Sequence, residues 1–139
     1  MNRCLGIDVG KKRIGVAVSD PLGITAQPLE MVARDGQGSE WKRFPEIFKE
    51  YSPETAVIGL PVNMDGTEGE QADAVRLFAK TFSRKFPDIR IVFQDERLTT
   101  AASERLLIEA GMRRSKRRTK RDIIAATLIL QTWLDKHKE

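Results

Sequence analysis

The sequence holds one cysteine and one histidine, and this scarcity excludes several kinds of protein. Cys4 has no second cysteine for an internal disulfide, and the chain contains no zinc-ligand cluster, which together favour a reducing compartment. His137 stands near the end of the chain, so a nuclease that depends on a catalytic histidine is disfavoured. A hydrolase with a cysteine or serine triad has no support either. The chemistry is therefore expected to come from carboxylates.

Long apolar runs are also missing. The longest uncharged apolar stretch, residues 123–134, is too short to span a bilayer. The first predicted strand begins within a few residues of Met1, which leaves no space for a signal peptide. The chain has 139 residues, of which 40% are hydrophobic and 32% charged, as is usual for one globular domain with one core. We expect a single cytoplasmic domain over residues 1–139, with no membrane partner.

Acidic residues are absent from one segment, residues 113–121, which carries seven basic residues. Removing these seven charges from the net charge of +4 leaves −3 for the rest of the chain. A strongly basic segment on a mildly acidic body is typical of a protein that contacts phosphate backbones, although a solvated charged loop would have the same composition.

The first twenty residues predict a hairpin with an acid inside it. Apolar residues alternate with small ones over residues 4–9 and 14–19, which is the period of a strand, and a basic turn joins the two strands. Asp8 lies within the first strand, where a carboxylate is costly unless a cation or a donor pairs with it. The neighbouring glycines and Ala17 suggest that something large approaches the backbone there. The alternative is a structural aspartate that caps the turn at Gly10.

The rest of the chain alternates between helical and extended patterns. The predicted strands cover residues 24–32, 55–60 and 89–93, and the predicted helices cover about 41–51, 72–86, 99–110 and 120–136. Pro28 favours an edge position for the third strand, and Pro45 indicates that the first helix starts late or kinks. The order predicts an α/β fold: a mixed five-stranded sheet, made of a three-stranded antiparallel meander and two parallel strands, with helices on both faces.

Three carboxylates from separate segments are expected to meet in this fold. Ligands sit beyond the C-terminal ends of parallel strands, where Asp95 and Glu96 fall. Asp122 shares a helical stripe with Ala125 and Ala126, which predicts that it points toward the sheet, although an acid that complements the helix dipole would occupy the same place. Three inward acids need a cation, and all-oxygen ligands select Mg²⁺ or Mn²⁺. Two such ions would serve phosphodiester hydrolysis.

Four collinear stretches resemble the motifs of the YqgF family, the RuvC-like resolvase homologues. They cover nearly the whole chain in the right order and are Gly6–Asp20, Gly59–Glu68, Asp95–Thr100 and Asp122–Gln131. The resemblance implies a ribonuclease H-like fold and a metal-dependent nuclease with Asp8, Glu96 and Asp122 as catalytic acids and metal ligands. It also implies processing of the 5′ end of precursor 16S ribosomal RNA, with cleavage of branched DNA at a Holliday junction as the alternative.

The second acid departs from the wider superfamily. Ribonuclease H-like enzymes usually take it from the end of the fourth strand, which here reads Gly59-Leu60-Pro61. The pair after the fifth strand looks like the replacement, with Glu96 as the ligand and Asp95 as the alternate. The two residues point to opposite faces if the strand stays regular, and only one can reach Asp8.

Nucleic-acid binding is assigned to basic residues of the first turn and of the basic segment. They are Lys11, Lys12, Arg13, Arg113, Arg114, Lys116, Arg117, Arg118, Lys120 and Arg121. Two other functions stay open. The first hairpin also resembles the phosphate-binding hairpin of actin-like ATPases and sugar kinases, which need two such lobes, and a non-catalytic RNA-binding module would keep the basic residues without needing three acids. A monomer or a weak dimer is expected.

Overall fold

The computed structural model describes residues 3–96 and 114–137, and the side chains of these residues except 114–122. The strands are β1 (Arg3–Val9), β2 (Arg13–Ser19), β3 (Ala26–Ala33), β4 (Pro53–Leu60) and β5 (Arg90–Asp95), and the helices are α1 (Ser39–Tyr51), α2 (Glu70–Lys85) and α4 (Arg114–Lys136). No helix in these described ranges is both long and apolar enough to cross a membrane.

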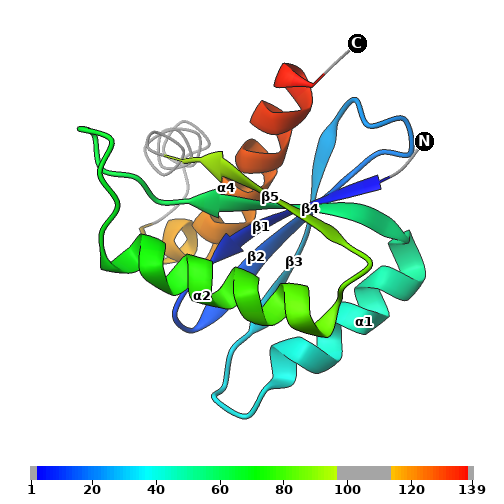
Figure 1. Cartoon of the computed structure of the whole chain (residues 1–139), viewed down its shortest axis with the longest axis horizontal. Coiled ribbons are helices and arrows are strands. Elements are labelled where there is room, and N and C mark those ends of the chain that lie inside the picture. The colour runs from blue at the N-terminus through cyan, green and yellow to red at the C-terminus, as the bar shows by residue number, and fades with distance from the viewer. Residues whose placement is uncertain (1–2, 97–113, 138–139) are drawn as a thin grey trace.

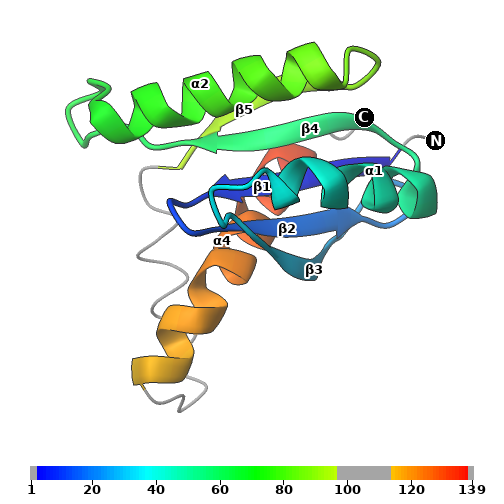
Figure 2. The same cartoon turned by 90° about the horizontal axis from the view of Figure 1, so that it is seen from below.

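The five strands form one mixed sheet in the order β3-β2-β1-β4-β5. Strands β1, β2 and β3 pair antiparallel, whereas β4 pairs parallel with both β1 and β5. Helices α1 and α2 cover one face of the sheet and α4 covers the other (Figures 1 and 2). The predicted meander with two added parallel strands and helices on both faces is confirmed.

The first hairpin buries both of its faces, not one as its sequence suggests. Leu5 and Ile7 belong to the larger core under α1 and α2, while Cys4 and Ala17 belong to the smaller core under α4. Burial raises the pKa of the Cys4 thiol, with a smaller contribution from the negative charge of Glu54. An inert, protonated thiol at this place fits a packing role.

Gly6, one of the small residues near Asp8, makes room for α4. A Cβ atom on Gly6 would lie 2.6 Å from both the carbonyl oxygen of Ala126 and the Cβ of Leu130. The space beside the strand is therefore filled by a helix whose own alanine lets it approach closely. The expectation that something large contacts this backbone was right, but the occupant is part of the chain.

Pro28 and Pro45 affect their strand and helix differently. Pro28 lies in the edge strand β3, as expected, where the ladder to β2 shifts register between Val16 and Ala17. Pro45 lies inside α1, which begins at Ser39, so the helix does not start after the proline. Proline lacks one backbone donor but the helix continues through it, because Phe44 and Ile47 are buried against the sheet.

Helix α4 differs most from its predicted bounds. It begins at Arg114, six residues before the predicted start, so most of the basic segment is helical backbone and not a separate loop. This is a correction of the predicted boundary. Its C-terminal half packs on the sheet through buried residues such as Ala126 and Ile129. The helix predicted over residues 99–110 lies outside the described residues.

Candidate active site

Asp8 sits near the C-terminal end of β1, on the face of the sheet that α4 covers. It pairs with Gly15 across the hairpin and lies one residue beyond the Ile7–Ile58 pair of the β1–β4 ladder. This register places it level with Gly59 on the neighbouring strand. Asp8 is half-buried, and its strand is paired on both sides.

Glu96 reaches the same place from the other side of β4. Its backbone N–H donates to the carbonyl oxygen of Leu60 at 3.1 Å, which continues the β4–β5 pairing past the end of β5. A Cβ atom on Gly59 would lie 2.9 Å from Oε2 of Glu96. The Glu96 side chain thus leans over Gly59, toward the strand that carries Asp8. Cδ1 of Ile129 lies closer still, 2.3 Å from the same Cβ position, so the glycine accommodates both side chains.

The predicted separation of Asp95 and Glu96 onto opposite faces is what the register shows. Leu60, opposite Asp95, packs in the core under α1 and α2, whereas Gly59 pairs with Gln94, on the α4 face together with Glu96. Asp95 is exposed and Glu96 half-buried. Of the two acids, Glu96 is therefore the one on the face that carries Asp8, and its choice as the metal ligand stays a prediction.

The third acid, Asp122, is placed by its backbone alone. It lies on α4, three and four residues before Ala125 and Ala126, which are buried against the sheet. The orange N-terminal part of α4, the turn after β1 and the ends of β4 and β5 lie at the same side of the molecule (Figure 1). For Asp122 and for the basic residues from Arg114 to Arg121, the structure describes the backbone and not the side chains.

The basic residues of the first turn are at the same end of the sheet. Lys11 and Lys12 are exposed, and Arg13 is half-buried at the start of β2. The turn stands three residues from Asp8, so a phosphate bound there would be close to the acids. Arg113 lies outside the described residues. The other basic residues of the segment, from Arg114 to Arg121, are placed only by the backbone of α4.

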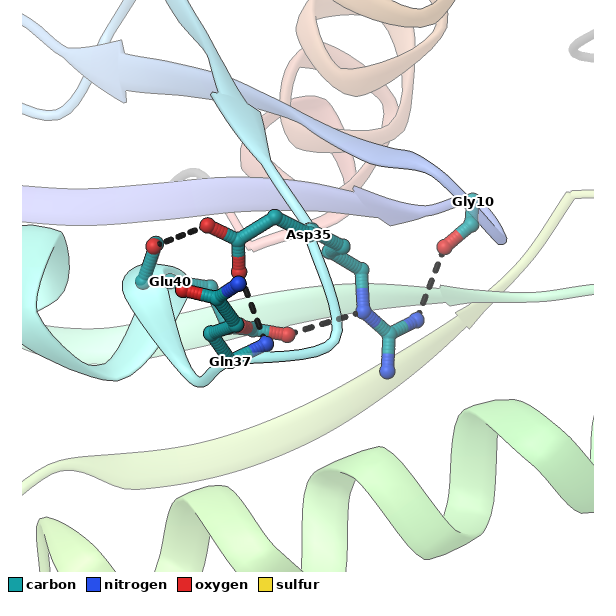
Figure 3. Close-up of polar contacts among 6 residues, drawn as sticks. Gly10, Asp35, Gln37 and Glu40 are labelled. Carbon is teal, nitrogen blue, oxygen red and sulfur yellow. Dashed lines mark hydrogen bonds and ion pairs between the residues drawn. The ribbon is translucent and has the colours of Figure 1, made fainter.

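Arg34 holds this turn in place, and nothing in the sequence pattern points to it. Its Nη1 donates to the carbonyl oxygen of Gly10 at 2.8 Å, and its Nε donates to Oε2 of Glu40 at 3.0 Å. Its backbone N–H also donates to the carbonyl oxygen of Lys12 at 2.9 Å. Figure 3 shows the two side-chain bonds, which join α1 to the turn that follows the Asp8 strand.

The Arg34–Glu40 ion pair is partly buried. The side chain of Glu40 is 7% exposed, that of Arg34 is 29% exposed, and Oε1 of Glu40 has no hydrogen-bond partner among the described residues. The Arg34 guanidinium also lies 5.6 Å from the centre of the Phe78 ring. Because moving Arg34 would leave the buried Glu40 carboxylate without its cation, the position of the Arg34 guanidinium is strongly constrained. The constrained guanidinium in turn fixes the Gly10–Lys12 turn through its bond to Gly10.

The loop after β4 is closed by its own polar contacts. The backbone N–H of Asn63 donates to the carbonyl oxygen of Thr67 at 2.8 Å, and Nδ2 of Asn63 donates to the Thr67 hydroxyl at 2.9 Å. The Thr67 hydroxyl donates to Oδ1 of Asp65 at 2.7 Å. Gly66 has a positive φ of 90°, which favours glycine. The polar residues of this motif therefore shape the loop beside the acids.

A divalent cation fits the described acids in donor type. Asp8 and Glu96 offer only carboxylate oxygens, which is the donor set that Mg²⁺ and Mn²⁺ prefer. The described residues hold no group of three or more His, Cys, Asp and Glu that forms a complete metal cage. Two protein carboxylates are nevertheless enough for Mg²⁺, which keeps several of its waters or takes substrate oxygens.

Comparisons with known proteins agree with these observations. The family model RuvX, described as "Holliday junction resolvase", matches residues 2–136. A relative from Lactococcus lactis subsp. cremoris (strain MG1363), named "Putative pre-16S rRNA nuclease", is 47% identical over 137 residues, which cover 97% of this chain and 95% of the relative. A relative of the same name from Limosilactobacillus reuteri (strain DSM 20016) is 45% identical over 138 residues, which cover 97% of this chain and 94% of the relative.

Solved structures show the same fold at low sequence identity. RuvC of T. thermophilus, in complex with a Holliday junction substrate, aligns with a TM-score of 0.57 and 15% identity over 98% of this chain and 96% of its own. The Fowlpox virus resolvase, in complex with Holliday junction DNA, aligns with a TM-score of 0.56 and 12% identity over 99% of both chains. The ribonuclease H-like fold expected from the sequence is confirmed.

Proposed function

Because this chain belongs to the RuvX family, the family called YqgF above, we propose that it is a metal-dependent nuclease that processes precursor 16S ribosomal RNA in the cytoplasm. The observation that carries the proposal is the placement of the Glu96 carboxylate over Gly59, toward the strand of Asp8. Both side chains are carboxylates, which are the donors that Mg²⁺ and Mn²⁺ prefer. The substrate is inferred from the names of the relatives, and the type of reaction is inferred from the acids.

Asp8 and Glu96 would hold the divalent cation, with Asp122 as the third ligand and Mg²⁺ or Mn²⁺ as the ion. When bound, the cation lowers the pKa of a water and stabilises the leaving oxygen of a phosphodiester, and a pair of ions would do both at once. The rigid β1–β4–β5 ladder fixes the backbone of both described acids. The Lys11–Arg13 turn supplies positive charge beside them, which offsets the repulsion between the acids and an approaching phosphate.

The family description and the bound DNA in the similar structures support a second candidate function, cleavage of a Holliday junction. The two functions use the same acids and differ in substrate shape. A direct comparison separates them: precursor 16S ribosomal RNA and a synthetic four-way DNA junction are incubated with the protein, each with Mg²⁺ and with Mn²⁺. Faster cleavage of the RNA at a defined 5′ position supports the first function, and faster cleavage of the junction supports the second.

The variant Asp8→Asn tests the metal site. It keeps the shape of the side chain and removes the charge that a cation needs, so we expect cleavage to fall at least about a hundredfold. We also expect Mg²⁺ binding, measured by calorimetry, to weaken and the metal-free protein to become slightly more stable, because one of two neighbouring negative charges is gone. The matched control is Asp88→Asn, on an exposed acid between α2 and β5. Normal cleavage by Asp8→Asn would contradict the assignment.

A further inference from the structure

A groove that the proposed chemistry does not use lies between α2 and β5, on the face of the sheet opposite the acids. It has a volume of about 570 Å³, and its lining includes Arg76, Lys80 and Arg84 from the helix and Ile91 and Phe93 from the strand. Helix α2 runs along β5 in both views of the molecule (Figures 1 and 2). Cations line one wall of the groove and an aromatic ring lies on the other.

Phe93 is the unusual residue of this groove. It pairs with Ile58 and therefore points to the face that α1 and α2 cover, where Ile58 is completely buried. Phe93 itself is 38% exposed. The reason is its place on β5, the edge strand of the described sheet, which has no described neighbour on its outer side. Together with the cations near it, this ring offers a face on which an unpaired base can stack.

Arg76 holds the ring in position without adding free charge. Its guanidinium carbon lies 5.0 Å from the centre of the Phe93 ring. Its Nε and Nη2 donate to the two carboxylate oxygens of Glu68 at 2.8 and 2.9 Å. The charge of Arg76 is thus compensated by Glu68. The arginine serves as a flat cover on part of the ring, and it is fixed by two bonds.

Lys80 and Arg84 carry the free positive charge of the groove. They follow Arg76 at intervals of four residues along α2, so the three residues lie on one side of the helix. Both are exposed, and neither forms an ion pair with any other residue in the described part of the chain. The acids of α2, Glu70 and Asp73, lie in its first turn, away from these two residues.

A row of cations beside an exposed aromatic ring matches the chemistry of a single-stranded nucleic acid. Its phosphates need cations along a track, and its unpaired bases need a flat apolar surface on which to stack. A duplex hides its base faces and could use only the cations.

The groove also leads toward the acids. Phe93 precedes Glu96 by three residues, which is about 10 Å along an extended chain. The side chains of Phe93 and Glu96 lie on opposite faces of the sheet. An RNA segment in the groove therefore has to pass round the C-terminal end of β5 to reach the acids. We propose that the α2–β5 groove binds a single-stranded segment of the RNA substrate next to the cleavage site, with a base on Phe93 and phosphates at Lys80 and Arg84.

The inference depends on the proposed function only for the identity of the ligand, and a binding assay tests it separately. Binding of a short, labelled single-stranded RNA to the full chain is measured by fluorescence anisotropy, without divalent metal, over a range of salt concentrations. For Lys80→Gln/Arg84→Gln we expect a log–log salt slope lower by about 1.4, at about 0.7 per phosphate contact on a single strand. The matched control, Lys42→Gln/Lys49→Gln on α1, removes the same charge and should keep the wild-type slope.

The aromatic contact has its own variants. Phe93→Ala should weaken RNA binding roughly 5- to 150-fold, the range that corresponds to one stacked base, and Phe93→Trp should restore it. Neither should weaken binding of an RNA duplex of equal length. Thermal unfolding of the exposed-residue variants checks that the fold is kept.

The outcomes are distinct. A wild-type protein that binds the RNA but cleaves nothing in Mg²⁺ contradicts the proposed function and leaves the groove assignment intact. A protein that cleaves precursor RNA while the groove variants bind single strands as well as the control does contradicts the groove assignment. Equal losses on single strands and duplexes, or no binding of single-stranded RNA by the wild type, contradict it as well.

Discussion

The carboxylate of Glu96 occupies the space that a side chain on Gly59 would need. A Cβ atom at Gly59 would lie 2.9 Å from Oε2 of Glu96 and 2.3 Å from Cδ1 of Ile129. Both atoms end flexible side chains, so they can move aside at a cost. The glycine therefore allows the acid to lean toward Asp8, and it also allows α4 to pack closely on β4.

Gly59→Ala should separate catalysis from folding. The added methyl group overpacks the region, and we expect a loss of about 1–3 kcal/mol in the free energy of unfolding, measured by urea denaturation. Because Glu96 is pushed from its place, cleavage in Mg²⁺ should fall by a larger factor than the stability loss accounts for. Ile129→Val shortens only the other contact and is the control, with normal cleavage expected. Equal cleavage by the wild type and Gly59→Ala would show that Glu96 does not need this position.

Glu96→Gln should damage cleavage more than Asp95→Asn does. Both changes remove one negative charge from adjacent residues and keep the side-chain size. Only Glu96 lies on the face that carries Asp8, whereas Asp95 lies on the other and is exposed. Initial rates in Mg²⁺, with the affinity for Mg²⁺ from calorimetry, compare the two. Activity lost in Asp95→Asn and kept in Glu96→Gln would reverse the assignment of the ligand.

The Arg34–Glu40 ion pair should stabilise the folded protein. Arg34→Ala leaves the buried Glu40 carboxylate without its partner, and we expect a loss of about 3–5 kcal/mol in the free energy of unfolding. Arg34→Ala/Glu40→Leu removes the stranded charge as well and should be more stable than the single variant. If the double variant is the less stable of the two, the carboxylate is solvated in the single variant and the pair does not act as a buried unit.

The same pair should affect catalysis, because Arg34 also holds the carbonyl oxygen of Gly10. In the double variant the turn is released while the core is kept. We expect a lower kcat with a smaller change in KM, since the acids are misplaced more than the substrate is. A double variant with the wild-type kcat would show that the turn needs no anchor.

The strand pattern was readable because it is local. Alternation placed Asp8 inside β1 and separated Asp95 from Glu96, and turn residues marked most boundaries. The start of α4 lies outside the predicted bounds because residues 114–119 are only basic and hydroxyl residues, and without apolar residues the sequence shows no helical period there. The close packing of α4 on Gly6 was invisible because it depends on a residue pair 120 positions apart.

The contacts between distant segments were also beyond the sequence. The Arg34–Gly10 bond joins residues 24 positions apart and has no periodic signal. Phe93 looked like an ordinary core residue of a strand, and it becomes an exposed ring only because β5 is the last strand of the sheet. Edge position is a property of the topology, so alternation alone cannot distinguish a covered ring from an open one.

The ionisation of Asp20 should make the free energy of unfolding depend on pH. The backbone N–H groups of Thr25 and Ile24 donate to its Oδ1 at 2.9 and 2.7 Å, and these bonds lower the pKa of Asp20 from its ordinary value of 3.8. A lowered pKa means that the charged form stabilises the fold above the unfolded-state pKa, and that this contribution is lost as the pH falls through the folded-state pKa. The stability difference between wild type and Asp20→Asn should therefore shrink as the pH falls below about 4. A difference that stays constant down to the folded-state pKa would contradict it.

The basic part of α4 should bind phosphates and bring them to the acids. The helix begins at Arg114 and carries the basic residues directly before Asp122, so bound phosphates lie within one or two helical turns of a proposed metal ligand. Lysine and arginine at this place recognise charge and not sequence, so affinity should change alike for all sequences. If four of the seven residues contact phosphates, replacing Arg114, Arg117, Arg118 and Arg121 by Gln should lower the log–log salt slope by roughly three to four units. Turnover at saturating substrate should change much less, because the acids remain. An unchanged slope would mean that the segment is a solvated helix end and that the substrate approaches by another path.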